Sequence, residues 1–293
     1  MSNCLQPSFF VVGAQKAGTT TLADILCQHS EICIPPIKET KFFLFDADYA
    51  KGISFYNSYF TNYKGQMAVG EFDPDYLLFP STAKRIAETL GNTVKIIVVL
   101  RNPADRAYSH YLMTRKKGLD TLQFENAILE EKNRKQDIKT QKIFAYIERG
   151  YYGKQLGEFL KVFPLGNFLF LVFEEDFIRN RENTIKRVQE FLTVPFEALD
   201  INIHSNEAGE AQSDVVRDLV RKPNFVKKLL KFVLPSKEAR KNIRKFFIRK
   251  NMQKAASPNL SAETRKRILD KYFMEDIHLT EQLINRNLGV WYK

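Results

Sequence analysis

The chain has 293 residues, of which 44% are hydrophobic and 27% charged, with a formal net charge of +11. This composition is enough to bury the core of one large α/β domain. The longest apolar runs, such as 96–100 and 168–173, are far shorter than the roughly 20 residues of a membrane-spanning helix. The opening residues, MSNCLQPS, have no basic region followed by an apolar stretch, so we predict a cytoplasmic protein without a membrane span or signal peptide.

Cysteine and histidine usage argues against a disulfide framework and a metal site. The three cysteines lie at positions 4, 27 and 33 without CxxC spacing, and the four histidines are scattered without an HExxH pair. Neither set has the spacing of metal ligands. We therefore predict no metal.

Short β-rich runs alternate with segments of helical periodicity along the first two thirds of the chain. The β-rich runs are 8–12, 67–71, 95–100 and 168–173, and the helical segments are 19–28, 81–90, 103–117, 154–163 and 182–192. The alternation predicts one α/β domain over 1–293, with a central parallel sheet of about five strands flanked by helices. We expect the α/β core at 8–200 and a mainly helical extension at 201–293.

The first strand leads into a glycine-containing loop, in the sequence FFVVGAQKAGTT at 9–20. Gly13 and Gly18 have the spacing of a P-loop, but Lys16 lies inside the loop instead of following the second glycine. Backbone N–H groups and the helix that starts after such a loop are suited to bind an anion. The alternative is a glycine-rich turn without a ligand.

A second polar motif follows the strand at 95–100, in the sequence RNPADRAYSHYLM. Arg101 stands at the carboxyl end of that strand, where open α/β sheets bind ligands. Pro103 suits the first position of a helix, on which Ser109 follows. Arg101 and Ser109 are therefore candidates to hold a second phosphate.

Together, VVGAQKAGTTTL and VVLRNPADRAYSHY resemble the paired phosphate motifs of sulfotransferases that use 3′-phosphoadenosine 5′-phosphosulfate (PAPS), above all the heparan sulfate sulfotransferases and their bacterial relatives. The resemblance covers most of the chain apart from about 200–255. It continues through IKETKFF, VGEFDPDYL, ERGYYGKQLGEFLKVFP, FLFLVFEEDF, VQEFL and LDKYFMEDIHLTEQLINRNLGVW.

The resemblance implies a P-loop-kinase-like fold and assigns the two motifs to the two ends of PAPS. The first loop would bind the 5′-phosphosulfate, and the second motif, through Arg101 and Ser109, the 3′-phosphate. Lys16 would stabilise the negative charge that develops on the bridging oxygen, without a metal. The expected contacts of the first loop are Gln15, Lys16, Ala17, Gly18, Thr19 and Thr20.

The family's general base is a glutamate in the segment that matches KETKFF, which assigns that role to Glu39. The alternative is a solvated loop residue between Lys38 and Lys41.

The segment VGEFDPDYL departs from relatives that act on anionic glycans, which often carry a lysine where this chain has Phe72. Carboxylates disfavour an anionic acceptor. We therefore expect Glu71, Asp73 and Tyr76 to bind a neutral or cationic small molecule, which would be sulfated on a hydroxyl or on an amine or amide nitrogen. One alternative is a carbohydrate O- or N-sulfotransferase. Another is that Asp73 only caps a turn at Pro74.

The positive charge is concentrated in the segment 217–250, which contains 13 Lys and Arg residues and two acidic residues. Apolar residues at helical spacing predict an amphipathic helix there. Its basic face is either solvated, a lid over the nucleotide, or a contact for an acidic partner or membrane surface. We expect no nucleic-acid partner. A kinase-like nucleotide-binding protein and a basic membrane- or nucleic-acid-binding module remain the alternatives of another class.

Overall fold

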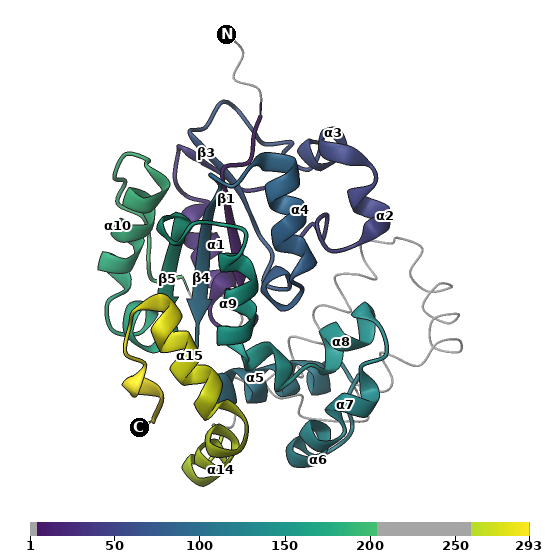
Figure 1. Cartoon of the computed structure of the whole chain (residues 1–293). Coiled ribbons are helices and arrows are strands. Elements are labelled where there is room, and N and C mark those ends of the chain that lie inside the picture. Colours follow the sequence, from purple (N-terminus) through teal and green to yellow (C-terminus); the bar gives the residue numbers. More distant parts are fainter. Residues whose placement is uncertain (1–4, 204–258, 293) are drawn as a thin grey trace, which may run out of the picture.

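The computed structural model describes residues 5–203 and 259–292, and it has a central parallel sheet between layers of helices (Figure 1). The strand order is β2-β3-β1-β4-β5, and every neighbouring pair is parallel. The strands are β1 (Phe9–Gly13), β2 (Ile32–Cys33), β3 (Ala68–Phe72), β4 (Lys95–Leu100) and β5 (Phe168–Val172). The predicted sheet is confirmed. Strand β2 had no sequence signal because two residues are too few to form a pattern.

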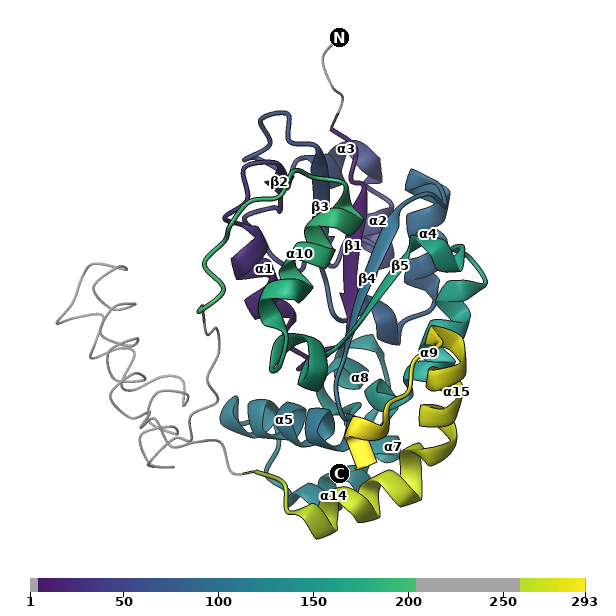
Figure 2. The ribbon, with the colours of Figure 1, turned by 90° about the vertical axis from the view of Figure 1, so that its left-hand side faces the viewer.

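Helices cover both faces of the sheet (Figure 2), with α1 and α10 on one side and α4 and α9 on the other. Helix α15 packs alongside α9, and α5 lies beyond the carboxyl ends of the central strands (Figure 1). The helices in the described residues are α1 (Thr19–Leu26), α2 (Asp46–Tyr49), α3 (Gly52–Asn57), α4 (Ser81–Leu90), α5 (Pro103–Lys116), α6 (Phe124–Leu129), α7 (Glu131–Arg134), α8 (Ile138–Phe144), α9 (Tyr152–Leu160), α10 (Arg181–Leu192), α14 (Ala262–Ile268) and α15 (Met274–Ile284).

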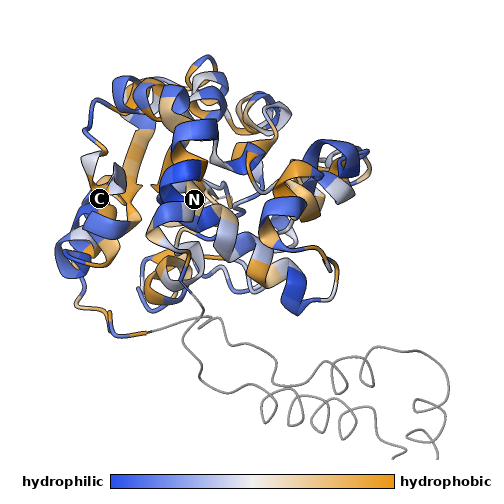
Figure 3. Ribbon diagram, turned by 90° about the horizontal axis from the view of Figure 1, so that it is seen from below, coloured by the Kyte–Doolittle hydropathy of each residue, from blue (hydrophilic) through white to orange (hydrophobic). Residues whose placement is uncertain are grey.

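The strands are largely apolar on both faces, and Glu71 in β3 and Lys95 in β4 are their charged residues. All five residues of β1 and of β3 are buried, as expected for a parallel sheet. Figure 3 shows hydrophobic residues on the strands and hydrophilic residues over much of the outer helices. None of the helices described is both long enough and apolar enough to cross a bilayer.

The strand order changes direction at β1, because β3 lies on one side of β1 and β4 lies on the other. Open α/β sheets bind ligands at the carboxyl ends of strands at such a point. Two backbone hydrogen bonds extend the strand pairing past the ends of β1 and β3: Ala14 N–H donates to Val99 O at 2.7 Å, and Asp73 N–H donates to Val11 O at 3.0 Å. The glycine-containing loop and the VGEFDPDYL segment therefore leave the sheet side by side.

The start of α5 is held by residues that lie far from it in the sequence. Asn102 caps the helix, since its side-chain oxygen accepts from Ala104 N–H and Asp105 N–H. Its own N–H donates to Glu174, and its amide nitrogen donates to Trp291 O at 3.0 Å. This fixes the backbone next to Arg101.

The helical extension is described only in part. Helices α14 and α15 lie within it, whereas the basic segment 217–250 lies outside the described residues. The domain limits remain a prediction.

Candidate active site

The loop between β1 and α1 has the backbone of an anion-binding cradle. Lys16 and Gly18 have positive φ angles of 72° and 93°, and Ala17 N–H donates back to Ala14 O at 3.1 Å. Helix α1 begins at Thr19, so the N–H groups of its first turn have no acceptor within the helix. A side chain at position 18 would lie 3.0 Å from the Phe173 ring, which explains the need for glycine.

The loop carries positive charge that the described residues do not neutralise. Burial, reinforced by Arg101 and the lysines of the α5 end, lowers the pKa of Lys16 to about 8. No carboxylate in the described ranges lies within ion-pair distance of Lys16 or Arg101. A bound phosphate or sulfate would relieve this repulsion.

Arg101 is fixed in place beside the same loop. Its guanidinium donates to Lys16 O at 3.0 Å and stacks over the Phe173 ring, 5.0 Å from its centroid. The Tyr152 hydroxyl donates to Arg101 O at 2.9 Å. Ser109 is partly exposed on α5, and no hydrogen bond joins its side chain to Arg101. The structure thus brings Arg101 to the loop between β1 and α1, which we call the donor loop because it is the part expected to bind the sulfuryl donor. A phosphate site shared with Ser109 remains a prediction.

Lys38 connects the donor loop to the segment that carries Glu39. Its ammonium donates to Thr20 Oγ1 at 2.9 Å and lies 5.9 Å from the centroid of the Phe72 ring. Burial lowers the pKa of Lys38, although Glu39 partly offsets this effect. Because Glu39 follows Lys38 directly, its backbone is held next to the donor loop.

Glu39 is the partly exposed acid of this region, with 39% of its side chain accessible. Its carboxylate pairs with Lys41 at 3.1 Å. Lys41 also contacts Asp73 at 2.6 Å and Asp75 at 2.7 Å. Glu39 thus forms an ion pair with Lys41 while its side chain stays partly exposed, and its role as the base remains a prediction.

The three residues expected to bind the acceptor are buried. Glu71 and Tyr76 are 0% exposed and Asp73 is 1% exposed. Glu71 accepts from the hydroxyls of Tyr56 and Tyr76 at 2.8 and 3.2 Å, and Asp73 pairs with Lys41. These side chains are occupied by partners inside the protein. The argument that their charge selects a cationic acceptor therefore has no support from their position.

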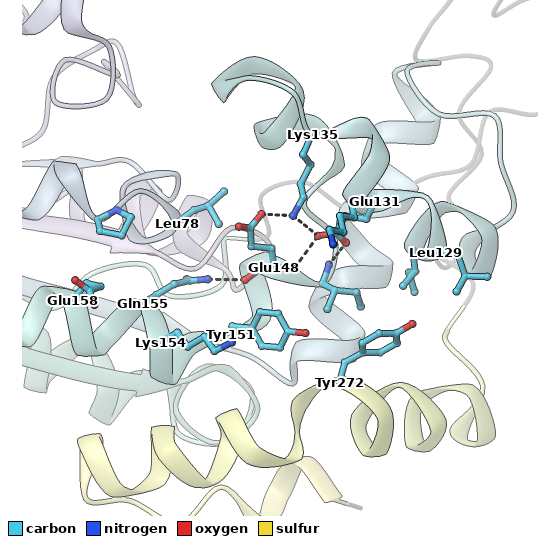
Figure 4. Close-up of a pocket in the computed structure, with 14 residues that line it drawn as sticks. Leu78, Leu129, Glu131, Lys135, Glu148, Tyr151, Lys154, Gln155, Glu158 and Tyr272 are labelled. Atoms are coloured by element: carbon cyan, nitrogen blue, oxygen red, sulfur yellow. Dashed lines mark hydrogen bonds and ion pairs between the residues drawn. The ribbon is translucent and has the colours of Figure 1, made fainter.

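A cavity of about 860 Å³ lies between α6, α7, α9 and the helical turn at 269–273 that precedes α15 (Figure 4). Figure 4 shows Lys135 between Glu131 and Glu148 on one wall, with Tyr151 and Tyr272 on another. Its lining includes no residue of the donor loop and does not include Glu39. We therefore place the candidate chemistry at the carboxyl ends of the strands and not in this cavity.

Sequence reasoning did not assign roles to Lys38, Lys41 or Phe173. Lys38 and Lys41 flank Glu39 in the motif KETKFF, and this charge alternation was the available signal. Phe173 had no comparable signal, because its contact with the donor loop depends on how β5 lies in the sheet.

The fold and the cradle place this chain among the P-loop-like α/β proteins that bind a nucleotide at the carboxyl ends of a parallel sheet. The family model of the sulfotransferase domain matches residues 6–281, so the chain belongs to the sulfotransferase family. The resemblance expected from the two motifs is confirmed. A sulfotransferase structure from Alicyclobacillus acidocaldarius has a TM-score of 0.70, with 25% sequence identity over 99% of this chain and 100% of that one.

Relatives with assigned names point to the same branch. Heparan sulfate glucosamine 3-O-sulfotransferase 3B1 from Mus musculus is 30% identical over 202 residues, which is 69% of this chain and 50% of the relative. The membrane-associated sulfotransferase kil1 from Dictyostelium discoideum is 40% identical over 111 residues, which is 37% of this chain and 23% of the relative. The chain thus spans about half the length, or less, of these relatives.

Proposed function

We propose that this protein transfers the sulfuryl group of PAPS to a hydroxyl, or to an amine or amide nitrogen, of an acceptor molecule. The observation that carries the proposal is the bond from Lys38 to Thr20, at 2.9 Å. It joins the segment that carries Glu39 to the first turn of α1, near Lys16 and Arg101, which lack carboxylate partners among the described residues.

In the proposed reaction, the acceptor atom forms a bond to sulfur while the bond from sulfur to the bridging oxygen breaks. The electron pair of that bond passes to the 5′-phosphate, giving adenosine 3′,5′-bisphosphate. Lys16 stabilises the charge that grows on the bridging oxygen. Glu39 accepts the proton that the acceptor loses. The backbone N–H groups of the loop hold the transferred group and the 5′-phosphate, and Arg101 with Ser109 would hold the 3′-phosphate.

The first test separates PAPS chemistry from that of a kinase. Calorimetry with adenosine 3′,5′-bisphosphate and with ATP should show tight binding only of the bisphosphate. Removal of its 3′-phosphate should weaken binding, because Arg101 loses a charge-assisted partner. Equal affinity for ATP would contradict the proposal.

The second test identifies the acceptor. Radiolabelled PAPS is incubated with sugars, phenols, steroids and amine- or guanidine-bearing compounds, and the labelled product is analysed by mass spectrometry. Glu39→Gln should lose transfer while it still binds adenosine 3′,5′-bisphosphate. Wild-type turnover in that variant would remove Glu39 from the role of base.

A carbohydrate acceptor is the second candidate, and the named relatives favour it. The burial of Glu71 and Asp73 also removes the charge that argued against an anionic sugar. A heparan sulfate oligosaccharide therefore belongs in the acceptor panel beside the small molecules.

A further inference from the structure

The segment that carries Glu39 has an unusual backbone. Glu39 and Lys41 have φ angles of 65° and 61°, in a left-handed region that costs side chains other than glycine about 1–2 kcal/mol each. Two buried carboxylates support this conformation. Thr40 N–H donates to Glu71 at 2.6 Å, and Lys41 N–H donates to Asp73 Oδ2 at 3.1 Å. The acids at the end of β3 thus hold the backbone on which Glu39 stands.

The Lys41 side chain fixes the direction of the Glu39 carboxylate. Its ammonium contacts Oε2 of Glu39 at 3.1 Å, whereas Oε1 has no hydrogen-bond partner in the part of the chain that the structure describes. Lys41 is 16% exposed and Glu39 is 39% exposed. One carboxylate oxygen is therefore tethered, and the other remains available to accept a proton.

Lys41 is itself held by Asp73 and Asp75. Asp75 also pairs with Arg149 at 2.6 Å and with Lys142 at 3.1 Å. Burial alone would lower the pKa of Lys41, but Asp73, Asp75 and Glu39 raise it well above its ordinary value. The ammonium is therefore charged at neutral pH and is held in place by several carboxylates.

We propose that Lys41 and Asp73 are positioning residues for the Glu39 carboxylate, acting through that carboxylate and not on the acceptor. This inference rests on the proposed role of Glu39 as the base. Asp73 aligns both the backbone and the ammonium of Lys41, since it accepts from Lys41 N–H and from Lys41 Nζ. In this proposal, the acids expected to bind the acceptor orient the base.

The test is a double-mutant cycle between Lys41→Met and Glu39→Gln. The rate is measured with radiolabelled PAPS and the best acceptor of the panel, or with water as the acceptor if no panel member reacts. We expect Lys41→Met to lower kcat on the order of 10²-fold, the effect of misplacing a reacting group by about 1 Å. The dissociation constant of adenosine 3′,5′-bisphosphate should change by less than about twofold, because the donor loop is untouched. In the Glu39→Gln background, Lys41→Met should have no further effect.

Two further variants keep the result interpretable if Lys41→Met folds poorly. The first is the double variant Lys41→Met with Asp73→Asn, which removes one charge of each sign. In this variant Asp75 retains its ion pairs with Arg149 and Lys142. Lys41→Arg retains the charge and should recover part of kcat. The matched control is Lys51→Met, which removes a lysine from an exposed ion pair with Asp48 at 2.6 Å and should leave kcat unchanged.

The outcomes separate the two proposals. If Glu39→Gln is strongly impaired and adding Lys41→Met lowers the remaining rate by the same factor as in the wild type, Lys41 does not act through Glu39 and the positioning role is overturned. If Glu39→Gln turns over normally, the proposed base itself is wrong and the positioning role fails with it. A kcat unchanged in both Lys41→Met and the charge-paired double variant would overturn the positioning role alone.

Discussion

The candidate site has a donor half, around Lys16 and Arg101, and an acceptor half, around Glu39 and Lys41. The two halves differ in whether their cations are paired. In the donor half, Lys16 and Arg101 stand without a carboxylate partner in the described residues, and burial lowers the pKa of Lys16 to about 8. In the acceptor half, Lys41 is surrounded by carboxylates at 2.6–3.1 Å. In the donor half, two cations are thus left to pair with an anionic ligand, whereas the ammonium of Lys41 is already paired within the protein.

The largest expected effect tests the donor half. Lys16→Ala should lower kcat on the order of 10²–10³-fold, because it removes the charge that stabilises the leaving phosphate. The fold should remain intact, since Lys16 contributes repulsion and not an ion pair in the free protein. Single-turnover assays with PAPS give the rate, and circular dichroism checks the fold. Loss of the folded state would contradict the view that this lysine serves the ligand alone.

In the acceptor half, we expect substitution of a carboxylate to lower the stability of the fold. Asp75→Asn leaves Lys41, Lys142 and Arg149 with less compensation, and we expect the free energy of unfolding in urea to fall by about 3 kcal/mol. Asp48→Asn, in an exposed pair with Lys51, should cost less than about 1 kcal/mol.

The pH dependence of the Asp75→Asn effect has a defined sign. Arg149, Lys41 and Lys142 outweigh burial and hold the pKa of Asp75 well below its ordinary value. The stability that Asp75 contributes is therefore present at neutral pH and is lost as the pH falls through the lowered pKa. The difference between wild type and Asp75→Asn should shrink in strong acid. A constant difference would show that the ionised carboxylate is not the cause.

A smaller effect separates backbone strain from ligand geometry. Gly18→Ala should lower the free energy of unfolding by about 1–2 kcal/mol, because alanine disfavours a φ of 93°. It should also weaken binding of adenosine 3′,5′-bisphosphate, since the new Cβ meets the Phe173 ring. Gly52→Ala is the control, with a φ of 77° and nothing within 4 Å of the added Cβ. Equal binding loss in both variants would exclude the Phe173 contact as the cause.

The smallest expected effect is a change of affinity with pH. A bound anion favours protonated Lys16, so affinity for adenosine 3′,5′-bisphosphate should fall by up to about fivefold between pH 8 and pH 9. Calorimetry in two buffers of different ionisation enthalpy should detect proton uptake on binding. Lys16→Arg should abolish the uptake, because a guanidinium stays charged in this range. Uptake that persists in Lys16→Arg would assign it to another group.

Local sequence patterns predict strands β1, β3, β4 and β5, the loop with Lys16 and the resemblance to the family. Strands such as 95–100 are continuous apolar runs, and the loop with Lys16 lies within one short segment, so local pattern was sufficient to find them. The paired motifs also located Arg101 at a strand end. These features depend on residues that are close together in the sequence, so their spacing can be read from it directly.

The role of Glu71 and Asp73, at the end of β3, depends on how the strands pack together. From their charge, Glu71 and Asp73 were interpreted as acceptor contacts, but the packing of β3 beside β1 buries them. A carboxylate buried in this way must find donors inside the protein, and here Tyr56, Tyr76 and Lys41 provide them. Whether an acid contacts a ligand or supports a loop depends on its burial. That burial follows from the pairing of β3 with β1, two strands far apart in the sequence, and leaves no local pattern.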